Sequence, residues 1–270
     1  MKDASQKVIV VATALIIAAT FATKATADQS IASNKYTVDD RRSGYTFATK
    51  ETNAIQNDDM QNPAIFRVDD GEALFKKKDG KANTACITCH GKGFDMKGVA
   101  TRYPVYDENL GKMKNIEQQI NKCRVDYQQA KPWKYESNEL LAMTIYVRHQ
   151  SRGMPMNVSI DGKTVPFFKK GKAFYYKRLG ALDMACKHCH EDNPGKRARA
   201  NLLSQGQING FPTYRFKWQK VGSTHRRFRG CNKNIRAKPQ KYGSDDYVNL
   251  ELYISWRGRG LPVETPAVRN

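Results

Sequence analysis

The pentapeptide Cys-x-x-Cys-His occurs twice in this chain of 270 residues, at Cys86–His90 and at Cys186–His190. It is the attachment sequence of a c-type haem: two thiols add to the haem vinyl groups, and the histidine becomes the proximal iron ligand. A Cys-x-x-Cys pair alone would also suit a zinc or redox site, but the adjoining histidine selects haem. We therefore predict two covalently bound haem c groups, attached through Cys86, Cys89, Cys186 and Cys189, with His90 and His190 as iron ligands.

The sequence around the first motif recurs about a hundred residues later. Gly71–Phe75 precedes the first motif at the same distance as Gly171–Tyr175 precedes the second, with glycine, alanine and lysine positions in register. After the motifs, the apolar stretches Leu140–Tyr146 and Leu250–Ile254 each lead to an Arg-Gly-x-Pro sequence. We expect an amphipathic helix before each motif and a closing helix, stopped by Gly and Pro, after it.

Self-similarity at this period indicates duplicated domains, and neither copy shows strand-like alternation of any length. The predicted fold is all-α, with two tandem cytochrome c-like domains related by duplication and an irregular N-terminal arm. The first domain should span residues 63–160 and the second residues 161–270, because Asp161-Gly162-Lys163 is typical of a turn. Each domain is small, so the haem itself would fill much of its core.

The N-terminus has the pattern of a targeting segment. Lys2 and Lys7 flank the start, an apolar run follows from Val8 to Phe21, and Ala25-Thr26-Ala27 is a small-x-small cleavage site. We expect residues 1–27 to be a signal peptide for the periplasm, followed by a polar arm over residues 28–62. The alternative is an uncleaved membrane anchor, which the shortness of the run disfavours. Nothing later is apolar enough to span a membrane.

The formal charge is +20, from 46 lysines and arginines against 26 acidic residues. No helix-turn-helix, zinc-finger or RNA-recognition signature accompanies this charge, so we do not expect a nucleic-acid partner. A basic surface can serve solubility alone, but it also attracts an anionic substrate or an acidic partner protein, and we favour that second interpretation.

Two cysteines remain once four are assigned to haem: Cys123, 33 residues after His90, and Cys231, 41 residues after His190. One interpretation is a disulfide between them. The duplication favours another, in which each thiol is the sixth ligand of its own iron. For the second haem no methionine follows His190, so the candidates are Cys231, His225 or a lysine. For the first haem we prefer Cys123 as the sixth ligand, and three methionines are alternatives: Met143, Met154 and Met156.

Arginines crowd the sequence around Cys231. Arg226, Arg227 and Arg229 lie within five residues of it, and Arg236, Arg257 and Arg259 follow. They could form a solvated basic loop. They could also bind an oxyanion, because the guanidinium fork suits sulfonate-like groups, and positive charge near a sulfur stabilises the thiolate. The pattern favours chemistry on sulfur oxyanions.

The two haem motifs, Cys123, the Arg227–Ala237 segment and the ending Gly260–Arg269 resemble SoxA, the family of dihaem subunits of SoxAX cytochromes. The resemblance covers nearly the whole chain after the signal peptide. It implies an L-cysteine S-thiosulfotransferase that joins thiosulfate to a cysteine of the SoxYZ carrier protein. Two electrons would pass to the monohaem subunit SoxX and then to an external cytochrome c.

The resemblance also implies residue roles. His90 with Cys123 would ligate the iron of the first haem, and His190 with Cys231 that of the second. Cys231 would be the catalytic sulfur, carried as a persulfide, and Arg227 would bind the substrate. Thiosulfate is a dianion, so arginine beside an electron-rich sulfur would offset charge repulsion.

Three rival functions are a dihaem electron carrier without its own catalysis, a dihaem peroxidase and a haem-based redox sensor. The carrier would use Met or His as sixth ligand, and the peroxidase needs an iron site that can open. A cysteine ligand fits both poorly. Turnover of thiosulfate in the presence of the carrier protein would separate the enzyme from the sensor.

Overall fold

The computed structural model describes residues 34–91, 96–199 and 201–270. The expected signal peptide, residues 1–27, and the start of the expected arm, residues 28–33, lie outside the described residues. In the described part of the chain, no helix is both long and apolar enough to cross a membrane. Up to the middle of the chain the elements are η2 (Asn34–Tyr36), β1 (Thr37–Val38), β2 (Arg41–Arg42), η3 (Gly44–Phe47), α1 (Lys50–Asn57), α2 (Phe66–Lys76), α3 (Cys86–His90), η4 (Val99–Arg102), β3 (Val105–Asp107), β4 (Lys112–Lys114), α4 (Ile116–Asp126) and α5 (Asn138–His149).

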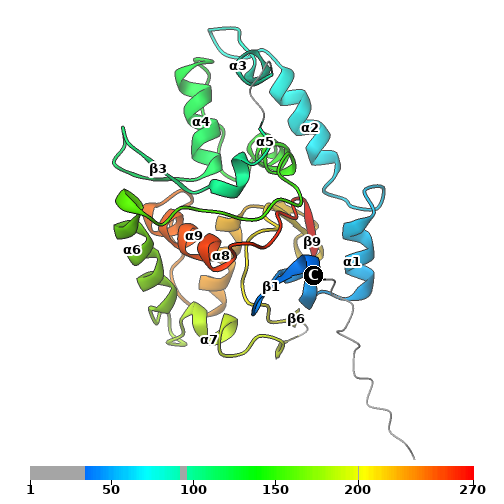
Figure 1. The fold of residues 1–270 in the computed structure, drawn as a ribbon, viewed down its shortest axis with the longest axis vertical. Helices are drawn as coiled ribbons and strands as arrows, with labels where there is room; N and C mark the ends of the chain where they lie inside the picture. Colours follow the sequence, from blue (N-terminus) through cyan, green and yellow to red (C-terminus); the bar gives the residue numbers. More distant parts are fainter. Residues whose placement is uncertain (1–33, 92–95, 200) are drawn as a thin grey trace, which may run out of the picture. The chain divides into compact units, whose positions relative to one another are not determined.

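The later part of the chain has a corresponding series of four α-helices, with more strands between them. In Figure 1, α2 to α5 occupy the upper part of the view and α6 to α9 the lower part. The elements are η5 (Gly162–Thr164), α6 (Val165–Tyr176), α7 (Cys186–His190), β5 (Arg197–Ala198), β6 (Asn201–Leu202), β7 (Thr213–Arg215), η6 (Phe216–Trp218), β8 (Lys220–Gly222), α8 (Thr224–Asn234), α9 (Asp245–Arg257) and β9 (Ala267–Arg269).

The helices expected on either side of each haem motif are confirmed, and they pack in pairs: α2 lies along α5, and α6 lies along α9. Each pair crosses at a glycine. A Cβ on Gly71 would lie 2.3 Å from the carbonyl oxygen of Ala142, and a Cβ on Gly171 would lie 1.9 Å from that of Asn249. Both crossings therefore bring backbone against backbone, which only glycine permits.

A tight loop leads from each of these helices into the haem motif. An isolated bridge closes the loop, between Asp79 and Thr84 in the first copy and between Leu179 and Met184 in the second. Gly80 and Gly180 occupy the same place in the two loops, with φ angles of 69° and 71°. An L-residue side chain is disfavoured in this left-handed conformation, so glycine fixes the entry into both motifs.

The two cysteines outside the motifs lie at equivalent positions on two helices of the same length. Cys123 is the eighth residue of α4 and Cys231 the eighth of α8, and both helices have 11 residues. Asn115 caps α4 by accepting a hydrogen bond from the Gln118 N–H, and Ser223 caps α8 in the same way. The cap fixes where each helix begins and so how far along it the thiol lies.

The described residues also contain strands of two or three residues, so the expectation of an all-α fold is not confirmed. The largest sheet has the order β8-β7-β9, with β7 antiparallel to β8 and parallel to β9. Strands this short give no alternating pattern, which explains why the sequence did not indicate them. The domain boundary at residues 160 and 161 stays a prediction.

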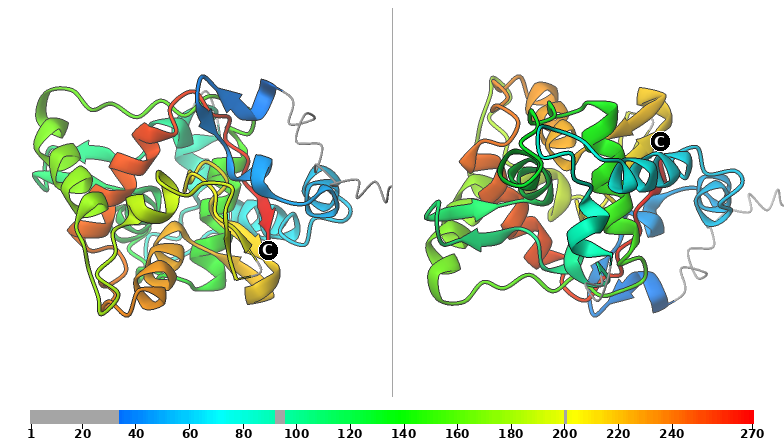
Figure 2. Two further views of the ribbon diagram at one scale, coloured as in Figure 1. Left: turned by 90° about the horizontal axis from the view of Figure 1, so that it is seen from below. Right: turned by 90° about the horizontal axis from the view of Figure 1, so that it is seen from above.

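The segment before α2 packs against the end of the chain. Figure 2 shows strand β9 beside the segment that contains α1. The buried Gln56 side chain of α1 donates to Glu264 at 3.1 Å and accepts from the Val268 N–H at 3.1 Å. Glu264 also accepts from Ser43 and from Arg269. These bonds hold the C-terminal strand next to β7, where it contributes to the site described below.

A buried polar cluster lies where α4, α8 and α9 meet. Glu251 accepts a hydrogen bond from Asn115 at 3.1 Å, and its Oε2 lies 3.1 Å from His225 Nε2. Burial and the nearby Glu251 raise the pKa of Glu117 above its ordinary value, although His225 and Arg148 oppose that shift. His225 is buried in this cluster and does not line the cavity described below, so the structure does not support it as the sixth ligand of the second haem.

Candidate functional site

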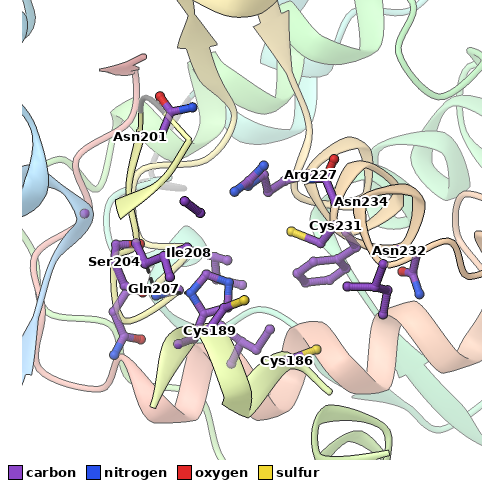
Figure 3. A pocket seen from close by; sticks show the side chains of 18 of the residues that line it. Cys186, Cys189, Asn201, Ser204, Gln207, Ile208, Arg227, Cys231, Asn232 and Asn234 are labelled. Atoms are coloured by element: carbon purple, nitrogen blue, oxygen red, sulfur yellow. Dashed lines mark hydrogen bonds between the residues drawn. The ribbon is translucent and has the colours of Figure 1, made fainter. Parts of the chain in front are cut away.

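A cavity of about 420 Å³ lies between α6, α7, α8, β7 and the loop of residues 201–211. It brings together five residues that the sequence singled out: Cys186, Cys189, His190, Arg227 and Cys231. Figure 3 shows the sulfur of Cys231 on one side of this space and Cys186 and Cys189 on the other, with Arg227 above Cys231. Most of the remaining wall is apolar, with Leu179, Leu182, Leu203, Ile208, Phe211, Phe228, Leu250 and Ile254.

Helix α7 positions the attachment cysteines and His190. Its first turn is fixed by the spacer residue His188, whose Nδ1 accepts the Ala185 N–H at 2.8 Å. His190 Nδ1 lies 2.7 Å from the carbonyl oxygen of Ser204 and must be the donor, since a carbonyl only accepts. That bond leaves Nε2 as the basic nitrogen, as in a histidine that ligates a metal.

Gly206 lies directly against the ring of His190. Its φ is 77°, and a Cβ there would lie 2.8 Å from His190 Cγ. The loop can therefore support the ring from behind only with glycine at this position. An oriented histidine, two attachment thiols and an apolar wall fit a covalently bound haem.

Cys231 faces His190 across this space. Burial raises the pKa of Cys231, but the charge of Arg227, the nearby His190 side chain and the charge of Arg215 outweigh it. Together they lower the pKa to about 6. The site thus stabilises a thiolate, the form that binds metals and attacks sulfur.

Arg227 lies one helical turn before Cys231 on α8, so both side chains project from the same face. No described carboxylate pairs with Arg227. Its neighbours have other partners: Arg226 pairs with Glu136 at 3.4 Å, and Arg229 donates to the carbonyl of Gln240. Of the three arginines near Cys231 in sequence, only Arg227 lines the cavity.

The more distant arginines do not behave as the sequence suggested. Arg257 pairs with Glu191 at 3.3 Å, Arg259 lies over Trp256, and neither they nor Arg236 lines the cavity. Instead, Arg215 on β7 and Arg269 on β9 line it. No motif near Cys231 signals these two residues, because the sheet β8-β7-β9 brings them there.

The first haem motif lies in the other helical series. Cys86 packs against the cluster of Phe75, Ala100, Ile116, Met143 and Val147, and burial raises the pKa of Cys86. Cys123 accepts a hydrogen bond from Gln119 Nε2 at 3.1 Å. It is close enough to Cys86 for its charge to act on that thiol. Residues 92–95, directly after the motif, are outside the described residues.

The alternatives left open for the first haem are placed as follows. Met143 lies in the same cluster as Cys86, Met154 contacts Gly98, and Met156 lies 3.9 Å from Arg148 Nη2. No disulfide joins any of the six cysteines, which are all among the described residues, so Cys123 and Cys231 are not paired with each other.

Comparisons with known proteins agree with this geometry. Residues 70–156 match the family model described as SoxA/TsdA, cytochrome c domain. The protein is therefore a c-type cytochrome, a class that binds haem c covalently. The chain is 44% identical over 234 residues to the L-cysteine S-thiosulfotransferase subunit SoxA of Pseudaminobacter salicylatoxidans, covering 86% of this chain and 82% of that one. It is 43% identical over 233 residues to the subunit of the same name from Rhodovulum sulfidophilum, covering 86% and 81%.

A solved structure is also similar. The crystal structure of SoxXA from P. pantotrophus superposes with a TM-score of 0.81 at 41% identity, covering 85% of this chain and 87% of that one. The chain belongs to the SoxA family of L-cysteine S-thiosulfotransferase subunits.

Proposed function

We propose that this chain is the catalytic dihaem subunit of a periplasmic cytochrome complex that conjugates thiosulfate to a cysteine of the SoxYZ carrier protein. One observation carries the proposal: Cys231 faces His190 in a cavity that also holds both attachment cysteines and an arginine without a carboxylate partner. An electron carrier needs no such arginine beside a thiolate.

Cys186 and Cys189 would hold the haem of this site, with His190 and Cys231 as the iron ligands. When bound, the haem supplies a centre that accepts electrons. Cys231, as a persulfide, would provide the sulfur atom at which thiosulfate is joined to the carrier cysteine. Formation of the new S–S bond between a thiol and thiosulfate releases one proton and two electrons.

Arg227 would bind the sulfonate oxygens of thiosulfate. The guanidinium fork donates two parallel hydrogen bonds to an oxyanion, and it places positive charge where the dianion approaches the electron-rich sulfur. The bond from His190 Nδ1 to the Ser204 carbonyl holds the ring in one tautomer. The apolar wall would exclude water from the reacting sulfur atoms.

The first motif would carry a second haem c through Cys86 and Cys89, with His90 and Cys123 as iron ligands. The equal places of Cys123 and Cys231 on α4 and α8 support this assignment. The matched glycine crossings and the matched loops support two tandem cytochrome c-like domains, residues 63–160 and 161–270, related by duplication.

The partners follow from the same reaction. The electrons would pass to SoxX and then to an external cytochrome c, and the acidic surface of a carrier protein would suit a chain with a net charge of +20. A signal peptide over residues 1–27 would direct the chain to the periplasm, where c-type haem attachment takes place.

The test is thiosulfate-dependent reduction of cytochrome c by the haem-loaded complex in the presence of the carrier protein. Cys231→Ala should abolish turnover while the haem content stays at the wild-type level. The control, Lys233→Ala, changes an exposed residue on the same helix and should keep full activity. Wild-type turnover in Cys231→Ala would reject the proposal and leave a dihaem electron carrier.

A further inference from the structure

The cavity around Cys231 has a strongly one-sided charge. Among the described residues that line it there is no aspartate or glutamate, whereas six cationic side chains do so: Lys177, Arg199, Arg215, Lys217, Arg227 and Arg269. Three of the six, Lys177, Arg199 and Lys217, are exposed, so water screens their charge. The other three are buried or half-buried and shape the inner part of the cavity.

The inner three differ in how their charge is balanced. Arg269 pairs with Glu264, its Nη2 lying 2.6 Å from Oε2. Arg227 has no carboxylate partner among the described residues, and neither has Arg215. Neither guanidinium is thus paired with a side-chain carboxylate, and both lie close enough to the Cys231 sulfur for their charge to act on it.

Arg215 is held firmly in the wall of the cavity. Only 9% of the residue is exposed. Its Nε donates to the backbone oxygen of Asn270 at 2.7 Å, Nη2 donates to the same oxygen, and the guanidinium lies 5.0 Å from the centre of the Trp218 ring. The backbone oxygen of Asn270 and the Trp218 ring orient the guanidinium of Arg215.

The orientation leaves one edge of the guanidinium available. The Nε and Nη2 edge is bound to Asn270, and no described residue accepts a hydrogen bond from Nη1. The second edge, Nη1 with the remaining hydrogen of Nη2, has the geometry that binds an oxyanion in a bidentate fork. Burial and the nearby charge of Arg227 lower the pKa of Arg215 to about 10, and the charge of Cys231 opposes that shift.

We propose that Arg215 is a second substrate-binding residue, which together with Arg227 holds the doubly charged thiosulfate beside Cys231. This inference rests on the proposed function. Two fixed guanidinium groups present two forks of N–H donors to the sulfonate oxygens, whereas Arg227 alone presents one. The C-terminal strand β9 takes part because Asn270, which follows it, positions the guanidinium. A carboxylate of the haem would present the same chemistry to Arg215, and the experiment separates the two anions.

The experiment measures thiosulfate binding to the haem-loaded complex by calorimetry, without carrier protein or electron acceptor. Arg215→Gln should weaken binding roughly 10- to 100-fold, the effect expected for a charge-assisted bidentate contact. Lys220→Gln is the matched control: it removes the same charge from the residue paired with Arg215 across the sheet, but it is exposed and outside the cavity. It should change the affinity less than about 3-fold, as expected for a screened surface charge.

Arg215→Lys keeps a charge but loses the fork, and it should weaken binding by an intermediate factor. If Arg215→Gln does not fold, this variant decides, and wild-type affinity in it would overturn the inference. Unchanged thiosulfate affinity in Arg215→Gln with a shifted haem reduction potential would assign Arg215 to a haem carboxylate and overturn it too. Absence of thiosulfate binding in the wild-type complex would overturn the proposed function itself.

Discussion

Replacing Gly171 by alanine tests the packing that shapes the haem-binding cavity. The added Cβ would lie 1.9 Å from the carbonyl oxygen of Asn249, whereas ordinary contact begins near 3.4 Å, so α6 and α9 would have to move apart by about 1.5 Å. Overpacking of this kind costs roughly 1–3 kcal/mol, and the better helix propensity of alanine returns about 1 kcal/mol at most. Because the overlap is with backbone, the cost lies in the upper part of that range, about 2–3 kcal/mol, and we expect a net loss of about 1–2 kcal/mol in the free energy of unfolding.

The assay is urea unfolding of the haem-loaded chain, followed by far-ultraviolet circular dichroism. Gly230→Ala is the matched control, because Gly230 lies inside α8 with nothing within 4 Å of an added Cβ. That variant should be stabilised by up to about 1 kcal/mol. The Gly171→Ala and Gly230→Ala substitutions should therefore shift the urea midpoint in opposite directions. A Gly171→Ala midpoint equal to or above that of the wild type would refute the assigned close contact of α6 and α9.

Three further predictions concern the sites. Gly206→Ala should push the His190 ring from its place and cost about 1–2 kcal/mol through its φ of 77°; an unchanged low-spin haem spectrum would contradict this. Arg227→Ala should raise the KM for thiosulfate roughly 10- to 100-fold in steady-state kinetics, and normal kinetics would exclude this residue from substrate binding. The raised pKa of Glu117 keeps its carboxyl protonated in the folded chain above about pH 4.5, whereas the same carboxyl ionises in the unfolded chain. The free energy of unfolding therefore falls as the pH rises above that value. Glu117→Gln should therefore raise Tm by a few degrees at pH 8 but not at pH 4, and equal shifts at both pH values would refute the assignment.

The sequence predicted the parts of the site that depend on short-range spacing. The pentapeptide at Cys186–His190 forms a single turn of helix, so its two thiols and its histidine stay together wherever the turn lies. Arg227 and Cys231 are one helical turn apart, which places them on one face. The apolar stretches around each motif predicted the paired helices, because the helical period can be recognised in a segment of more than ten residues.

Features that depend on distant segments could not be predicted. Arg215 and Arg269 reach the cavity through the pairing of β7 with β9, strands of three residues each, too short to show a periodic pattern. His225 lies two residues from Arg227, yet the helix turns it toward the buried Glu251 rather than toward the cavity. Local sequence gives the residue type at such positions but not the segment that it will meet.

The central claim is that the sulfur of Cys231 binds the iron of the haem attached at Cys186 and Cys189. Electron paramagnetic resonance of the oxidised, haem-loaded chain tests it directly when wild type, Cys231→Ala and Cys123→Ala are compared at equal haem content. We predict two low-spin, thiolate-type signals in the wild type, of which Cys231→Ala loses one and Cys123→Ala loses the other. A Cys231→Ala spectrum identical to that of the wild type would contradict the claim.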